Sequence, residues 1–205
     1  MRAPVKLFFA SSNPGKLKEF RALAGASSRS NEILLELLPQ YSSEPPYAED
    51  SPTFAENALG KALHYSRLTE EMVFADDSGL VVPFLGGAPG VHSARYAGER
   101  GTGEECNRKL LRELAGASGA QRSAYFCCAI ALVRRGQAIA IVTSRADGEI
   151  LENPQGNGGF GYDPVFYYPP LRKTFAQLSG EEKNEHSHRG KAFRRLMAVI
   201  NSAVE

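Results

Sequence analysis

The sequence predicts an α/β protein in which a mixed β-sheet is flanked by helices. Apolar runs typical of buried strands are intermixed with segments of helical periodicity along the chain. Apolar residues make up 42% of the 205 positions, enough for a sizeable core, and no stretch approaches the roughly 18 apolar residues of a membrane span. The 24 basic and 23 acidic residues nearly balance, which argues against a nucleic acid or a membrane surface as partner.

The chain opens with a predicted strand, a tight loop and a helix. Residues 5–10 form a short apolar run, residues 11–15 (Ser-Ser-Asn-Pro-Gly) have turn chemistry, and from Lys16 onward apolar residues recur on one helical face. Residues 25–52 are mostly Ser, Pro and Glu around one apolar island at 33–38, which we predict as a strand.

A second helix is predicted from the residues that would cap it. Thr53 fits the N-cap position and Glu56 the third helical position of a capping box, and the apolar spacing continues the helix to about residue 68. A short buried strand is expected at 73–75, ending at the polar residues 76–79. Residues 103–115 have the spacing of a further helix.

The second half of the chain is expected to hold a β-hairpin, a long loop and a final helix. Residues 123–133 and 138–146 read as strands joined by a turn at 134–137. Residues 153–164 are rich in Gly, Asn and Pro, as loops are, and the last helix is expected to begin near Ser187. The three cysteines have no C-x-x-C spacing and are interpreted as reduced thiols of a cytoplasmic protein.

The loop between the first strand and the first helix is a candidate phosphate site. The N–H groups and the partial positive charge of a helix N-terminus favour an anion, and Lys16 adds a full charge. The loop lacks the G-x-x-x-x-G-K-[ST] spacing of a Walker P-loop. An ordinary strand-to-helix turn has the same residue types, so the motif alone leaves both interpretations open.

Asp76 and Asp77 are candidate metal ligands. Adjacent carboxylates after an apolar strand repel each other, and Mg²⁺, which prefers oxygen ligands, would relieve that repulsion. One aspartate there would also be able to orient or deprotonate a water molecule. Glu49 or Asp50 would supply a second carboxylate. A surface turn is the alternative, because Asp-Asp-Ser-Gly suits one well.

Residues 156–164 combine glycines with two aromatic residues. The segment contains the pattern G-x-G-x-x-G, but a strand-like stretch follows it instead of a helix, so we reject a dinucleotide-binding motif. An aromatic loop can instead stack on a flat base. Lys183, His188 and Arg189 are rich in hydrogen-bond donors and suit a phosphate or the keto group of a base. A mobile connection and a charged helix start are the alternatives.

Six ordered motifs go beyond what each segment indicates alone. They are Ser-x-Asn-x-x-Lys at 11–16, Thr-Phe-x-x-Asn-Ala-x-x-Lys-Ala at 53–62, Asp-Asp-Ser-Gly-Leu at 76–80, Gly-Gly-Ala-Pro-Gly-Val-His-Ser-Ala-Arg-Tyr at 86–96, Gly-Phe-Gly-Tyr-Asp-Pro-x-Phe at 159–166 and Glu-Lys-Asn-x-x-Ser-His-Arg at 182–189. Together they resemble the inosine triphosphate pyrophosphatase family, also called XTP/dITP diphosphatases. The resemblance covers about residues 5–200.

The resemblance implies an elongated two-lobed fold, a single catalytic domain over residues 1–205 with a central cleft, and a homodimer. It implies Mg²⁺-dependent hydrolysis of ITP, dITP and XTP to the monophosphate and pyrophosphate. Asp77 would be the catalytic base, and Glu49 and Asp77 would bind the metal. The substrate-binding residues carried over from the motifs are Ser11, Ser12, Asn13, Pro14, Gly15, Lys16, Lys61, Ser78, Phe160, Gly161, Tyr162, Asp163, Lys183, His188 and Arg189.

The residue types are compatible with this chemistry. Lys16 and Lys61 would gather a polyanion, and a pocket of donors would pair with the 6-keto group of hypoxanthine or xanthine but stay unpaired against adenine. No Ser or Cys has a partner His in a recognisable arrangement for covalent catalysis. Two rival classes stay open: a nucleotide-binding regulator without catalysis, and a pyrophosphatase acting on modified pyrimidine nucleotides.

Overall fold

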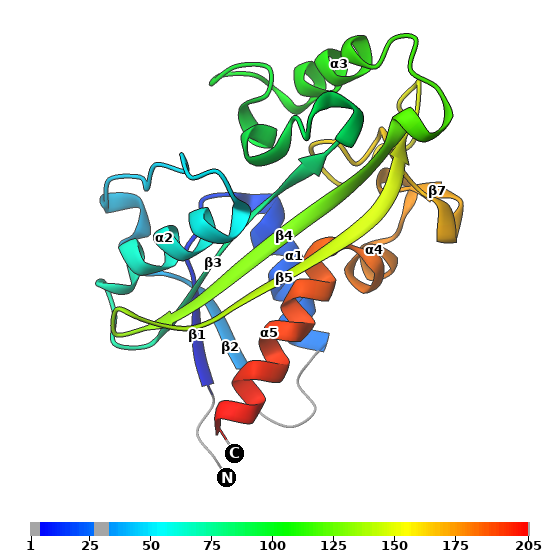
Figure 1. The fold of residues 1–205 in the computed structure, drawn as a ribbon. Coiled ribbons are helices and arrows are strands. Elements are labelled where there is room, and N and C mark those ends of the chain that lie inside the picture. The colour runs from blue at the N-terminus through cyan, green and yellow to red at the C-terminus, as the bar shows by residue number, and fades with distance from the viewer. Residues whose placement is uncertain (1–4, 27–32, 205) are drawn as a thin grey trace. The chain divides into compact units, whose positions relative to one another are not determined.

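Strands and helices are intermixed along residues 5–26 and 33–204, the part of the chain that this computed structural model describes. The strands are β1 (Val5–Phe9), β2 (Ile33–Leu37), β3 (Met72–Val81), β4 (Ser123–Arg134), β5 (Gln137–Ile150), β6 (Phe166–Tyr168) and β7 (Lys173–Thr174). The helices are α1 (Pro14–Ala26), α2 (Phe54–Ser66), α3 (Gly103–Glu113), α4 (Gly180–His186) and α5 (His188–Val204) (Figure 1). Residues 27–32 of the predicted polar stretch lie outside the described residues.

The strands form a seven-stranded sheet in the order β2-β1-β3-β4-β5-β6-β7. β1 runs parallel to both β2 and β3, whereas β6 pairs antiparallel with β5 and with β7. The sheet is therefore mixed, and the predicted α/β class is confirmed. No helix among the described residues is both long enough and apolar enough to cross a membrane.

The chain divides into two compact units. The first unit comprises Met1–Asp77, Cys128–Ser144 and Arg189–Glu205, and the second comprises Ser78–Cys127 and Arg145–His188. Each unit is assembled from separate stretches of sequence. The expected single catalytic domain with two lobes and a central cleft stays a prediction.

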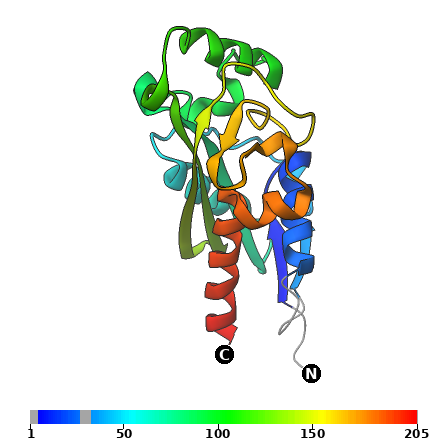
Figure 2. The ribbon, with the colours of Figure 1, turned by 90° about the vertical axis from the view of Figure 1, so that its right-hand side faces the viewer.

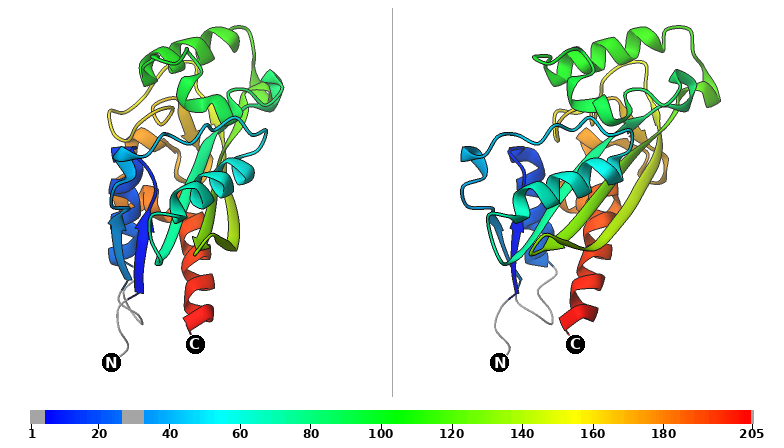
Figure 3. Two further views of the ribbon diagram at one scale, coloured as in Figure 1. Left: turned by 90° about the vertical axis from the view of Figure 1, so that its left-hand side faces the viewer. Right: turned by 60° about the vertical axis from the view of Figure 1, so that its left-hand side comes forward.

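The first unit has helices on both faces of its strands. Phe9 and Phe74 stack with ring centroids 4.7 Å apart and share a core cluster with residues of α1 and α5, which lie side by side in Figure 2. Phe8 and Val73 belong to a second cluster, formed with α2, which lies in front of the strands in the right-hand view of Figure 3. Successive side chains of a strand point to opposite faces of the sheet. Because helices bury both faces, consecutive strand residues are apolar, and the strands appear in the sequence as continuous apolar runs.

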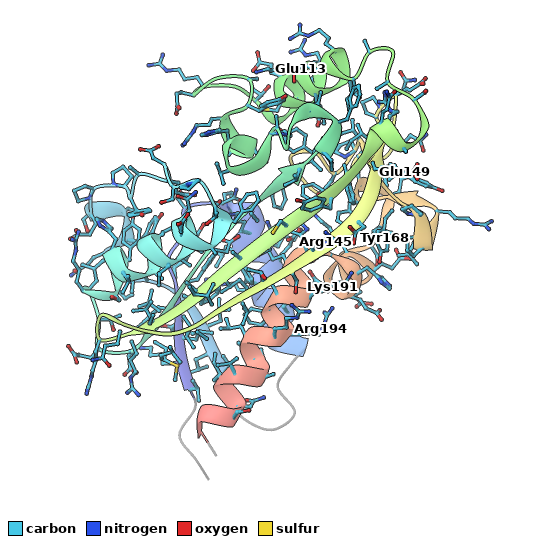
Figure 4. All side chains as sticks on the ribbon, in the orientation of Figure 1. Glu113, Arg145, Glu149, Tyr168, Lys191 and Arg194 are labelled. Carbon is cyan, nitrogen blue, oxygen red and sulfur yellow. The ribbon has the colours of Figure 1, made fainter. Side chains whose placement is uncertain are left out.

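The second unit has its own core beneath α3. Leu110 of α3 belongs to a cluster with Phe126, Phe166 and Phe175, and the Phe166 ring centroid lies 4.7 Å from that of Phe126 and 4.8 Å from that of Phe175. On β5, the guanidinium carbon of Arg145 (labelled in Figure 4) lies 5.2 Å from the ring centroid of Tyr125.

Two local predictions are confirmed by hydrogen bonds and backbone angles. The Thr53 hydroxyl accepts a hydrogen bond from the backbone N–H of Glu56 at 3.2 Å, so Thr53 is the N-cap of α2. Arg135 and Gly136 both have positive φ, 51° and 71°, as the turn between β4 and β5 requires for a tight hairpin.

The prediction of a short third strand is wrong. β3 does not end before Asp76 but continues through Asp77, Ser78 and Gly79 to Val81. These residues favour turns by local preference, but strand pairing and buried side-chain partners override that preference. Gly79 is needed in the strand because an added Cβ would lie 2.3 Å from the Ser93 hydroxyl oxygen.

Two further elements differ from the expectations. β5 extends past residue 146 to Ile150, and the short helix α4 precedes the last helix. A capping box marks the start of α4, since Ser179 and Glu182 exchange hydrogen bonds between side chain and backbone. This Ser-x-x-Glu pattern is visible in the sequence and was missed.

Candidate functional site

The loop that follows β1 is shaped by its own polar side chains. The Asn13 side-chain oxygen accepts a hydrogen bond from the backbone N–H of Lys16 at 3.1 Å, which makes Asn13 the N-cap of α1, and Pro14 takes the first helical position. Ser11 in turn accepts from the backbone N–H of Asn13 at 3.2 Å. Ser12 is exposed and Gly15 is partly buried. A cavity of about 590 Å³ adjoins the loop, lined by Ser11, Ser12, Asn13, Pro14, Leu17, Leu37, Leu38, Gln40, Tyr41, Ser42 and Ser43.

Asp76 is fully buried among cations. Lys16 Nζ lies 2.9 Å from Asp76 Oδ2, and Arg189 Nε lies 3.9 Å from the same oxygen. Arg189 also donates a hydrogen bond to the carboxylate of Glu19 on α1. Burial would raise the pKa of Asp76, but the charges of Lys16 and Arg189 hold that pKa below its ordinary value. Asp76 is thus kept as an anion inside the first unit.

Asp77 has a different environment. Its Oδ2 accepts a hydrogen bond from Asn57 Nδ2 of α2 at 3.0 Å, and the residue is 5% exposed. Burial raises the pKa of Asp77 to about 6, with the Glu49 carboxylate adding to that effect and Lys16 opposing it. A carboxylate that titrates near neutral pH is suited to proton transfer.

Glu49 and Lys61 form an ion pair beside Asp77. Lys61 Nζ lies 2.6 Å from Glu49 Oε1, and Lys61 is buried whereas the Glu49 side chain is 30% exposed. Burial disfavours the charge of Lys61, but the Glu49 and Asp76 carboxylates outweigh it and raise the pKa of Lys61. Within residues 5–26 and 33–204, no group of three or more His, Cys, Asp or Glu side chains is placed to hold a metal.

The second unit carries the aromatic loop. Asp163 is buried and accepts hydrogen bonds from the backbone N–H of Phe160 at 2.8 Å and from Lys183 Nζ at 2.5 Å. Lys183 Nζ also lies 4.7 Å from the centroid of the Phe160 ring. The loop is closed so tightly that a Cβ added at Gly159, where φ is +69°, would lie 2.0 Å from Asp163 Oδ2.

Asn107 and Ser93, which are not among the predicted site residues, hold this loop from outside. Asn107 of α3 donates from Nδ2 to the backbone oxygen of Gly161 at 3.0 Å. The Tyr162 hydroxyl donates to the backbone oxygen of Ser93 at 2.9 Å. Ser93 lies in the motif at 86–96, so that motif helps to hold the aromatic loop in place.

The structure thus distributes the predicted residues over two sets. The set in the first unit contains Ser11, Ser12, Asn13, Pro14, Gly15, Lys16, Glu49, Lys61, Asp77 and Arg189. The set in the second unit contains Ser78, Phe160, Gly161, Tyr162, Asp163, Lys183 and His188. His188 is buried and its ring stacks on Phe126 at 4.6 Å, and Ser78 is partly buried in β3. Arg189 contacts Glu19 and Asp76 of the first unit, and Lys183 contacts Asp163 of the second.

The protein has a mixed sheet with helices. It also has a buried set of carboxylates and lysines, and an aromatic loop with a buried lysine. These features define an α/β protein equipped for a charged, partly aromatic small molecule. Comparison with known proteins makes this specific. Residues 7–199 match the model of the Ham1 family, and the chain belongs to that family. The predicted family is therefore confirmed.

Relatives and solved structures agree with this assignment. The dITP/XTP pyrophosphatase of Geobacillus kaustophilus is 49% identical over 93% of this chain and 92% of its own length, and that of Nitrosomonas europaea is 46% identical over 96% and 94%. The structure of a HAM1 protein from Coxiella burnetii has 40% identity and a TM-score of 0.85 over 97% of this chain and 99% of its own. The Staphylococcus aureus Ham1 protein has 35% identity and a TM-score of 0.83 over the same shares.

Proposed function

We propose that this protein hydrolyses non-standard purine nucleoside triphosphates, ITP, dITP and XTP, to the monophosphate and pyrophosphate, and so cleanses the nucleotide pool. The observation that carries the proposal is the buried Asp77 carboxylate, which accepts a hydrogen bond from Asn57 and whose pKa is raised by burial to about 6. The relatives named dITP/XTP pyrophosphatase support the substrate class.

The first unit supplies the groups that would bind and activate the phosphates. The N-terminus of α1 and the side chain of Lys16 attract an anion, and Lys61 adds a second buried cation. Asp77 would accept a proton from the attacking water, since its pKa lies close to neutral pH. The pyrophosphate would leave with its charge compensated by Lys16 and Lys61.

The donor set fits Mg²⁺. Asp77 and Glu49 offer hard oxygen ligands, and their charges are close enough that Glu49 raises the pKa of Asp77. Mg²⁺ is commonly held by one or two carboxylates together with substrate phosphates, and Asp77 and Glu49 would supply these carboxylates. When bound, the ion would supply charge neutralisation on the phosphates. Asp77 and Glu49 would hold it, and Lys61, now paired with Glu49, would be placed to contact the phosphates.

The second unit supplies the groups that would read the base. Phe160 offers a flat ring beside Lys183, and Lys183 is oriented by its bond to Asp163. A lysine donor pairs with the 6-keto oxygen of hypoxanthine or xanthine, whereas adenine presents an amino group at that position and leaves the donor unpaired. We propose that Ser78, Gly161, Tyr162 and His188 complete the substrate contacts.

A panel of nucleotides tests the function. Pyrophosphate release is expected from ITP, dITP and XTP, with little from ATP, and EDTA should abolish it until Mg²⁺ is restored. A preference for modified pyrimidine nucleotides would instead identify the pyrimidine-specific rival class. Tight nucleotide binding without any release would identify a regulator.

Asp77→Asn tests the assigned base in the same assay. The loss of an acid–base group is expected to lower kcat by roughly 10²–10⁴ while the protein stays folded. A folded variant with near wild-type turnover would remove Asp77 from the mechanism.

We also propose that the protein is a cytoplasmic homodimer. Two-fold pairs are the commonest oligomers, and Cys106, Cys127 and Cys128 are free thiols, as is usual in a reducing compartment. In the loop at 86–98, Pro89 is buried and Tyr96 packs on the core of its own unit, so these apolar residues add no argument for the dimer. Light scattering at micromolar concentration should give twice the 22.2 kDa chain mass. A monomer mass would overturn this proposal.

A further inference from the structure

Asn57 is a fully buried amide at the start of α2 whose polar atoms are all used. Its Nδ2 donates to Asp77 Oδ2 at 3.0 Å and to the backbone oxygen of Ser51 at 3.3 Å. Its Oδ1 accepts from the backbone N–H of Ser51 at 2.9 Å. Because the Ser51 N–H can only donate, the amide has one possible orientation, with its N–H groups toward Asp77.

The same amide anchors the segment that carries Glu49. Ser51 lies two residues after Glu49, and both of its backbone polar groups are bonded to Asn57. Lys61 lies one helical turn after Asn57, on the same side of α2, and pairs with Glu49 at 2.6 Å. One face of one helix therefore holds both carboxylates.

We propose that Asn57 is a positioning residue that sets the orientation of Asp77 and its spacing from Glu49, and thereby the affinity of the site for a divalent cation. This inference rests on the proposed function, in which these two carboxylates hold the metal. A carboxylate has about four lone-pair sites, so one hydrogen bond orients it without exhausting its capacity to bind a cation. Mg²⁺ demands near-ideal geometry, so a ligand that rotates freely binds it less well.

The competing explanation is that the hydrogen bonds of Asn57 only stabilise the fold. A purely stabilising role would lower the free energy of unfolding when Asn57 is replaced, but it would not change cation affinity in protein that remains folded. A positioning role would weaken cation binding in folded protein. Partners of metal ligands typically contribute about 10–100-fold in affinity.

The test measures Mn²⁺ binding to nucleotide-free protein by electron paramagnetic resonance of the free ion, with folding followed by circular dichroism. Asn57→Leu, which has a similar volume and no polar atoms, should bind Mn²⁺ about 10–100-fold more weakly than wild type. Asn107→Leu is the matched control, because it removes another buried amide, 7% exposed, from the second unit and should leave Mn²⁺ affinity unchanged. Asn57→Ser, which keeps a polar group, replaces Asn57→Leu if the latter does not fold.

Three results separate the possibilities. Weaker Mn²⁺ binding by folded Asn57 variants, with turnover restored by excess Mg²⁺, supports the inference. Wild-type Mn²⁺ affinity in a folded Asn57 variant, combined with lost affinity in Asp77→Asn, overturns the inference and leaves the proposed function intact. Equal Mn²⁺ affinity of wild type and Asp77→Asn overturns the metal assignment and this inference together.

Discussion

Asp76 and Asp77 are neighbours on β3, yet the pKa values of their carboxyl groups shift in opposite directions. Asp76 lies on the strand face of Phe74, toward α1 and α5, where Lys16 and Arg189 lower its pKa against the effect of burial. Asp77 lies on the face of Val73 and is bonded to Asn57 of α2, and burial raises its pKa to about 6. The alternation of the strand thus gives two adjacent aspartates different partners and different chemistry.

Asp77→Asn should stabilise the metal-free protein at neutral pH. Because the folded-state pKa of Asp77 is raised, the stability associated with its protonated form is fully present below the unfolded pKa near 4 and is lost as pH rises through about 6. Removing the buried charge should therefore raise the free energy of unfolding on the order of 1–3 kcal/mol at pH 7.5, and by little at pH 4. Urea denaturation with EDTA at both pH values measures this.

Asp76→Asn is the matched comparison. The pKa of Asp76 is lowered, so its charge contributes stability that is present above the unfolded pKa and is lost as pH falls through the folded pKa. The variant should be less stable than wild type at pH 7.5 because Lys16 and Arg189 lose their buried counter-ion. Equal behaviour of the two variants would contradict the division of roles between the aspartates.

Replacing Arg189 should destabilise the first unit. Its guanidinium is buried and lies between Glu19 and Asp76, so Arg189→Met would leave two carboxylates without that charge. We expect a loss of about 3–5 kcal/mol in the free energy of unfolding, the usual range for breaking a buried ion pair. Arg189→Lys should recover part of it. A loss below about 1 kcal/mol would contradict a buried structural charge.

Lys183→Met tests base selection. Lys183 lies beside Phe160 and Asp163, so its removal should lower kcat/KM for ITP much more than for ATP. If Lys183 instead binds phosphate, which every nucleotide shares, both substrates should lose the same factor. Lys173→Met, on a lysine that is 43% exposed and pairs with Glu182, is a control for charge loss and should leave the ratio unchanged.

Arg122 should be important for the stability of the second unit. Its guanidinium donates to four backbone oxygens, those of Leu114, Ala117, Ile150 and Leu151, and so ties the end of α3 to the end of β5. Arg122→Ala should lower the free energy of unfolding by roughly 2–4 kcal/mol because these carbonyls lose charge-assisted partners. Arg112→Ala, at an exposed position of α3, should change it by less than about 0.5 kcal/mol. Thermal unfolding of both variants measures these two changes in stability.

Local patterns predicted most elements because each had its own signal. The cap at Thr53 and the turn at Arg135–Gly136 are determined by residues close in sequence, and both were found. The length of β3 could not be found in this way. Its polar half is extended because Lys16 and Asn57, which are remote in sequence, receive the two carboxylates.

The residues of the candidate site also divide into those with a local sequence signal and those that only the fold brings together. Motifs supplied Lys16, Lys61 and Asp77, whose residue types suggest chemistry directly. Glu19 was missed because it is one charge among several on an ordinary helix face, and only the fold brings it to Arg189. The partners of Lys183 and Arg189, which are Asp163 and Glu19, are likewise apparent only from the fold.

The division of each unit into separate stretches affects how the protein is made. β1, α1 and most of β3 leave the ribosome early, but the core around Phe9, Phe20 and Phe74 is completed by Phe193, Leu196 and Ile200 of α5. These three aromatic side chains are therefore covered only after the 17-residue helix α5 has been made. A nascent chain that lacks α5 would expose that aromatic cluster to chaperones, so the synthesis of α5 is needed for the first unit to reach its folded state.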